Sequence, residues 1–147
     1  MENDDTLTAA MQDYLEAILV LDREGAGARV KDIATSLGVK MPSVSSAITT
    51  LKRHALVEQR RYGVVQLTKA GRQVADAVYR RHEALVEFLT HILLLGPEEA
   101  ETEACQMEHA LSEVTLDRLV KLVELLRACP SGDACLSVLE GDGRSSH

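Results

Sequence analysis

Apolar residues recur at helical spacing along most of the chain. Met11, Leu15 and Ile18 lie three and four residues apart, which predicts a first amphipathic helix over about residues 7–22. Further helices are predicted over about residues 30–37, 42–54, 68–96, 97–112 and 116–128. Gly38 offers the left-handed residue that ends a helix cheaply, and Pro42 suits a first turn.

Two short β-branched runs interrupt this helical pattern. Leu56–Gln59 and Val64–Leu67 flank Arg60–Gly63, which predicts a hairpin with a basic tip. A helix, a glycine turn, a second helix and such a hairpin follow the order of a winged helix-turn-helix. The sequence therefore predicts a mainly α fold, with a winged helix-turn-helix domain at 1–70, an all-α domain at 71–128 and a flexible, Cys-containing tail at 129–147.

Charge is divided unevenly along the chain. The net charge is -7, yet residues 28–81 contain 11 Lys or Arg against 3 Asp or Glu, a balance of +8. The rest contains 5 basic and 20 acidic residues, a balance of -15. A basic segment attracts phosphates, so the predicted winged helix carries the charge that a DNA-binding module needs.

The start of the third helix is expected in the major groove of DNA, with the hairpin tip against the backbone or minor groove. The candidate DNA contacts are Lys40, Pro42, Ser43, Ser46, Lys52, Arg53, Arg60, Arg61 and Tyr62. Because serines dominate the start of the helix, backbone contacts and DNA shape are expected to carry much of the specificity. The alternative is a three-helix packing unit with solvated basic residues.

Potential metal ligands share helical faces. Asp13 and Glu16 are three residues apart, and Cys105, Glu108 and His109 follow spacings of three and four. His82 adds an imidazole from the long fourth helix. Taken singly, these residues also fit surface carboxylates, a packing histidine and a small buried thiol, and the pattern alone leaves those alternatives open.

The joint pattern resembles the diphtheria toxin repressor family of iron- and manganese-dependent regulators over about residues 6–127. The matching segments are Met11–Glu16, Val30–Ala34, Pro42–Ser45, Leu67–Gly71, Arg81–Glu83 and Glu103–His109. The resemblance implies that Asp13, Glu16, His82, Cys105, Glu108 and His109 bind Fe(II) or Mn(II). It also implies a homodimer, formed through the helices after Thr68, that binds double-stranded palindromic operator DNA and represses metal-uptake genes. A metallohydrolase would need a general base and a substrate pocket, and the sequence indicates no catalytic pocket, so no enzymatic activity is expected.

Two departures qualify the resemblance. Larger members carry an SH3-like domain for which 147 residues leave no room, so the short form is expected. Val86 and Glu101 stand where the ancillary site of larger members has a carboxylate and a histidine, so His82 is expected to serve the main site. The thiol ligand at Cys105 resembles the ligand type of the iron-responsive branch, whereas Asp13 with Glu16 resembles that of the manganese-responsive branch. Because a thiolate suits Fe(II) better than Mn(II), Fe(II) is the favoured metal.

Other features leave two alternatives open. A winged-helix regulator that responds to an organic effector or a redox signal would make the ligand pattern incidental. Cys129 and Cys135 suit a redox pair or a metal clip, but their spacing is not that of paired zinc ligands, which favours thiols on a loop. With no apolar run of about twenty residues and an acidic start, a cytoplasmic protein without a membrane span or signal peptide is expected.

Overall fold

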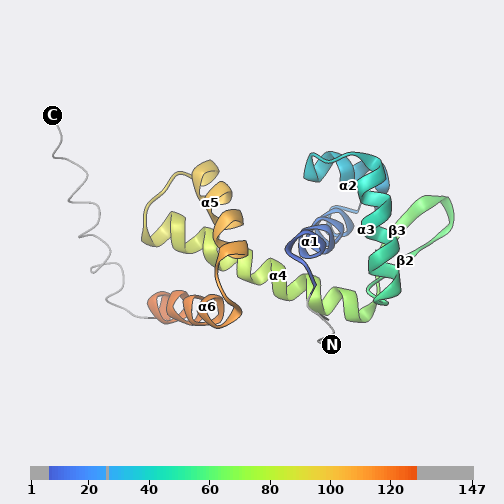
Figure 1. The fold of residues 1–147 in the computed structure, drawn as a ribbon. Helices are drawn as coiled ribbons and strands as arrows, with labels where there is room; N and C mark the ends of the chain where they lie inside the picture. Colours follow the sequence, from blue (N-terminus) through green and yellow to red (C-terminus); the bar gives the residue numbers. More distant parts are fainter. Residues whose placement is uncertain (1–6, 26, 129–147) are drawn as a thin grey trace. The chain divides into compact units, whose positions relative to one another are not determined.

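The computed structural model describes residues 7–25 and 27–128, except the side chain of Tyr62. The predicted tail with Cys129 and Cys135 lies outside these residues. The chain forms two compact units, Met1–Tyr79 and Arg80–His147, and the boundary falls within the helix α4, Lys69–Glu87 (Figure 1). Within the described ranges, none of the helices has the length and apolar character of a bilayer span.

The first unit is a winged helix-turn-helix, which confirms the predicted fold. Its elements are α1 (Ala9–Arg23), β1 (Ala28–Arg29), α2 (Val30–Leu37), α3 (Met41–Arg53), β2 (Val57–Gln59), the 3-10 turn η1 (Arg61–Gly63), β3 (Val64–Leu67) and the start of α4. The strands form an antiparallel sheet in the order β1-β3-β2. The sequence did not predict β1, because a two-residue strand shows no alternation, but it pairs Ala28 with Val65.

Local signals fix the ends of these helices. The Thr8 hydroxyl accepts a hydrogen bond from the Met11 amide at 3.3 Å and caps α1. Gly38 ends α2 with φ 64, a conformation that costs glycine little.

The core of the unit joins α1, α2 and α3 to the sheet and to α4. Its largest fully buried members are Leu15, Ile18, Leu19, Ile33, Val44, Leu51 and Val65.

The junction between hairpin and α4 is tightly built. The Thr68 hydroxyl donates to the Ala55 carbonyl at 2.7 Å and accepts from the Gly71 amide at 3.0 Å, as expected of an N-cap. The Thr68 amide donates to the Leu56 carbonyl at 3.0 Å. A Cβ at Gly71 would lie 1.8 Å from that same carbonyl oxygen, so only glycine fits. The first turn of α4 is therefore held against the residues that precede β2.

The second unit is helical. It contains the end of α4, a π-helical segment η2 (Phe88–Ile92), α5 (Pro97–Ala110) and α6 (Glu113–Ala128). The predicted single helix from Thr68 to Gly96 changes at Phe88, where the Leu93 amide bonds the Phe88 carbonyl at 3.0 Å with i to i+5 spacing. The core here consists of Leu85, Leu89, Ala100, Ala104 and Leu116.

We expect Gly71→Ala to lower the free energy of unfolding by about 2 to 3 kcal/mol, because the added methyl meets a backbone carbonyl that cannot move cheaply. Urea unfolding of the full chain measures this change. Gln73→Ala, on the exposed side of the same helix, is the control and should stay within about 0.5 kcal/mol of wild type. Wild-type stability in Gly71→Ala would contradict this close packing.

Candidate metal centre and DNA-reading surface

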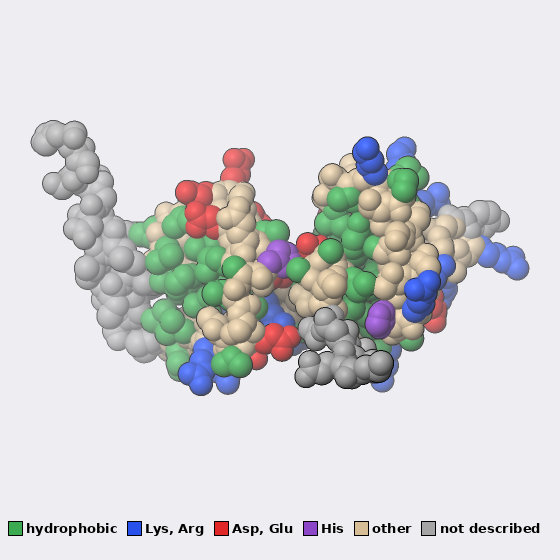
Figure 2. All heavy atoms as spheres, viewed as in Figure 1, with side chains coloured by type: hydrophobic (Ala, Val, Ile, Leu, Met, Phe, Trp, Pro, Cys, Tyr) green, Lys and Arg blue, Asp and Glu red, His purple; other side chains and the backbone are tan. Residues whose placement is uncertain are grey.

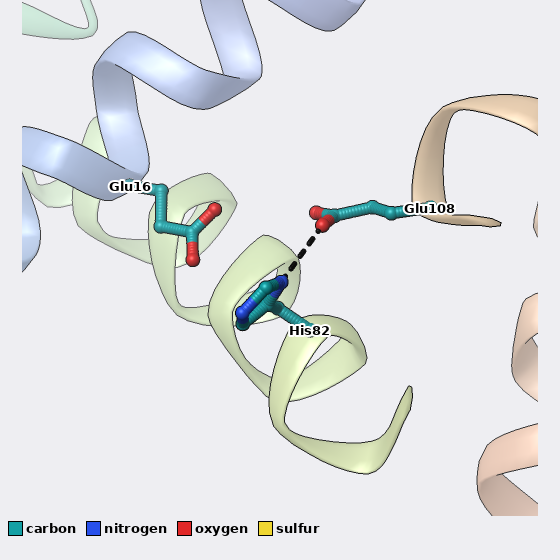
Figure 3. A group of neighbouring side chains, drawn as sticks. All are labelled: Glu16, His82 and Glu108. Carbon is teal, nitrogen blue, oxygen red and sulfur yellow. Dashed lines mark hydrogen bonds and ion pairs between the residues drawn. The ribbon is translucent and has the colours of Figure 1, made fainter. Parts of the chain in front are cut away.

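The ring of His82 faces carboxylates of α5 through both of its nitrogens. Nδ1 lies 3.1 Å from Oε2 of Glu108, and Nε2 lies 2.8 Å from Oε2 of Glu101. Figure 3 shows the contact with Glu108 as a dashed line. The His82 side chain is 16% exposed. The protein therefore encloses most of this imidazole and presents an oxygen at each of its polar atoms.

Helix α5 places the two carboxylates at different depths. Glu101 and Glu108 are seven residues apart, nearly two turns of about 3.6 residues, so they follow one line along the helix. Ala100 and Ala104 are fully buried in the apolar cluster of the second unit, and their small size lets α5 pack closely against the end of α4. The side chain of Glu108 is 4% exposed, whereas that of Glu101 is 61% exposed. The line thus runs from solvent into the interior.

Burial leaves one oxygen of Glu108 unsatisfied. Among the described residues, no group donates a hydrogen bond to its Oε1, which is buried. Such an atom costs about 1 to 3 kcal/mol, and more when charged. A divalent cation would satisfy it. The 3.1 Å between Nδ1 and Oε2 is close to the separation of adjacent ligand atoms on an ion with bonds of about 2.1 Å. Imidazole nitrogen and carboxylate oxygen suit a first-row divalent metal.

The other predicted ligands lie on two helices. Asp13 and Glu16 are half-buried on α1 of the first unit. Cys105 and His109 are exposed on α5. Within the part of the chain that the structure describes, these two do not join His82 and Glu108 in one cluster of ligand atoms. His109 is about 100° around the helix from Glu108, which accounts for its different direction.

The predicted DNA contacts are exposed at the start and end of α3 and on the hairpin. Exposed side chains in this set are Lys40, Pro42, Ser43, Ser46, Lys52, Arg53, Arg60 and Arg61. The side chain of Tyr62 lies outside the described residues. Lys52 donates to the Gln59 side chain at 2.7 Å, which ties the end of α3 to β2. Figure 2 shows Lys and Arg on the face of the first unit, and Asp and Glu gathered over α5 of the second.

Comparison with known proteins identifies the family. Residues 6–65 match the domain described as the iron dependent repressor N-terminal DNA binding domain. Residues 68–136 match the iron dependent repressor metal binding and dimerisation domain. The HTH-type transcriptional regulator MntR of Geobacillus kaustophilus is 33% identical over 117 residues, 80% of this chain and 82% of that protein. The chain belongs to the iron-dependent repressor family.

Other members of the iron-dependent repressor family include longer proteins. The diphtheria toxin repressor of Corynebacterium diphtheriae is 33% identical over 120 residues, which are 82% of this chain and 53% of that repressor. The chain therefore spans about half the length of that relative. The solved manganese regulator SloR has a TM-score of 0.68 at 32% identity, over 78% of this chain and 53% of its own. The predicted family is confirmed, and it is one of transcriptional repressors, not of enzymes.

The sequence did not predict the contact of Glu101 with His82. Glu101 entered only as a departure from the ancillary site of larger members. The signal was available, because Glu101 and Glu108 repeat at two turns on a predicted helix. What the sequence does not contain is the position of His82 beside that line, which depends on how α5 packs against α4.

We expect Glu108→Leu to leave the free energy of unfolding in EDTA unchanged or to raise it by about 1 kcal/mol, because it removes a buried oxygen without a partner. Mn(II) at about 100 times its Kd should stabilise the wild type by about 2.7 kcal/mol and the variant much less. Urea unfolding with and without Mn(II) measures both effects. A loss of more than about 2 kcal/mol in EDTA would mean that this carboxylate supports the fold itself.

Proposed function

We propose that this chain is a homodimeric transcriptional repressor that binds palindromic operator DNA when loaded with Fe(II) or Mn(II) and thereby controls genes of metal homeostasis. The observation that carries the proposal is the contact of the half-buried His82 with the buried Glu108, whose Oε1 lacks a donor among the described residues. It lies within residues that match a metal-binding and dimerisation domain, beside a matched DNA-binding domain. Action on DNA is the reason to place the protein in the cytoplasm.

In this proposal, His82, Cys105, Glu108 and His109 hold the metal from the helical side. Asp13 and Glu16 hold it from α1. A divalent cation supplies a positive charge that several carboxylates can share. The functional division into 1–70 and 71–128 stays a prediction.

Asp13 and Glu16 are coupled to the proposed DNA-reading surface by the packing of the helix that carries them. Both belong to α1, whose Leu15 and Ile18 share a core with Val44 and other residues of α2 and α3. Anchoring α1 therefore restricts α3 as well. When the two acidic side chains are held, we expect the reading helices of a dimer to keep one separation, and thermodynamic linkage then requires DNA to strengthen metal binding equally.

The homodimer is supported by apolar side chains on the surface of the second unit. These large exposed residues are Leu93, Leu94, Val114, Leu122 and Leu125. Large apolar side chains left in solvent are stabilised when a partner covers them. A two-fold dimer presents two identical reading helices, and their natural target is a site with the same symmetry, hence a palindrome.

We expect Mn(II) or Fe(II) to strengthen operator binding of the wild type at least about tenfold, within the usual range of coupling energies. Glu108→Leu should lose this enhancement while its helix content and dimer mass stay unchanged. Anaerobic titration of a DNA fragment that the Mn(II)-loaded wild type selects from random sequences measures the effect. Glu103→Ala, which removes an exposed carboxylate from the same helix, is the control. Full enhancement in Glu108→Leu would refute the proposed site.

We expect Arg60→Ala combined with Arg61→Ala to weaken binding to all DNA sequences, because the exposed wing then loses two phosphate contacts. The slope of log affinity against log salt concentration should fall by about 2. The control is Arg118→Ala, an exposed arginine of α6. An unaltered slope in the double variant would remove the wing from the DNA-contact surface.

A further inference from the structure

We propose that Glu101 is a positioning residue for the metal centre: it accepts a hydrogen bond from Nε2–H of His82 and so directs the lone pair of Nδ1 toward Glu108. The inference rests on the proposed function, since it concerns the same site. It assigns a role to a residue that the sequence pattern had placed outside the ligand set.

The first support is the arrangement around the ring. A metal ion binds a ring nitrogen only through its lone pair, and the other nitrogen then carries the proton. Oε2 of Glu101 lies 2.8 Å from Nε2, a distance typical of a charge-assisted hydrogen bond. Nδ1 faces Glu108, whose second oxygen is buried and accepts no bond from the described residues. The ring is thus divided into a proton side and a ligand side.

The depths of the two carboxylates agree with this division. Glu101 is 61% exposed and keeps its hydration while it accepts the bond, which suits an outer partner. Glu108 is 4% exposed and has exchanged its water for protein, which suits a ligand. Histidines that bind metals commonly donate their second N–H to a carboxylate, which fixes the tautomer and raises the basicity of the ligand nitrogen.

A second ion on Nε2, with Glu101 as its ligand, is the competing arrangement. That ion would need further donors beside Glu101. Val86, one turn along α4 from His82, is apolar and packs against the core cluster of the second unit. It offers no ligand atom, so the observations favour a hydrogen bond over a second ion.

Calorimetric titration of the full chain with Mn(II) tests the proposal. We expect Glu101→Ala to raise the Kd by about 10- to 100-fold, the usual effect of losing such an outer partner. Glu101→Gln keeps an acceptor oxygen and should recover part of the loss. Glu103→Ala removes one exposed carboxylate from the same helix and should match wild type. The number of ions per subunit should be the same in all four proteins.

A second measurement reads the tautomer directly and needs no variant. In the Zn(II)-loaded wild type, 15N NMR of the histidine rings should show His82 protonated at Nε2. Protonation at Nδ1 would overturn the proposal, as would a Kd of Glu101→Ala equal to that of Glu103→Ala. Loss of one ion per subunit in Glu101→Ala would make Glu101 a ligand instead. If wild type binds neither Mn(II) nor, under anaerobic conditions, Fe(II), the proposed function fails too; if it binds metal and only the Glu101 effect is missing, the proposed function stands.

Discussion

The burial of a carboxylate within a helical unit is the constraint on which the rest of this structure depends. Glu108 reaches the interior because Ala100 and Ala104 bring α5 close to the end of α4. The same approach sets His82 against the carboxylate line of α5. A chain that only needed stability would fill this position with an aliphatic residue, since a buried oxygen without a donor is unfavourable. The proposed role of Glu108 as a metal ligand accounts for this buried carboxylate.

The charge is divided between the two units in the way that the proposed DNA binding and metal binding require. The first unit combines exposed Lys and Arg on α3 and the hairpin with an apolar core, so it attracts phosphates without needing an excess of positive charge overall. The second unit gathers Asp and Glu around α5, which lowers the energy of a nearby cation (Figure 2). A net charge of -7 is therefore compatible with binding to a polyanion, because the two charges act in different parts of the chain.

Most of the fold could be predicted from periodicity and turn chemistry. The helices, Gly38 and the capping role of Thr68 all rest on interactions within a few residues, which a sequence displays directly. The strand β1 and the π-helical segment could not be predicted, because the first depends on a distant partner and the second on packing. The candidate site follows the same rule. The ligand types could be predicted, because they show as spacings along one helix, whereas the contact between Glu101 and His82 could not, because it requires two helices to be placed together.

The hydrogen bonds of Thr68 to Ala55 and Leu56, and the close approach of Gly71 to Leu56, bear on where the sequence of such a domain can change. The hairpin has a closed base, where three hydrogen bonds hold Thr68 and the Leu56 carbonyl leaves no room for a methyl group at Gly71, and an exposed tip at Arg60 and Arg61. Insertions and deletions are therefore expected at the tip rather than at the base. A change in the length or charge of the tip therefore need not disturb the base, which keeps its geometry.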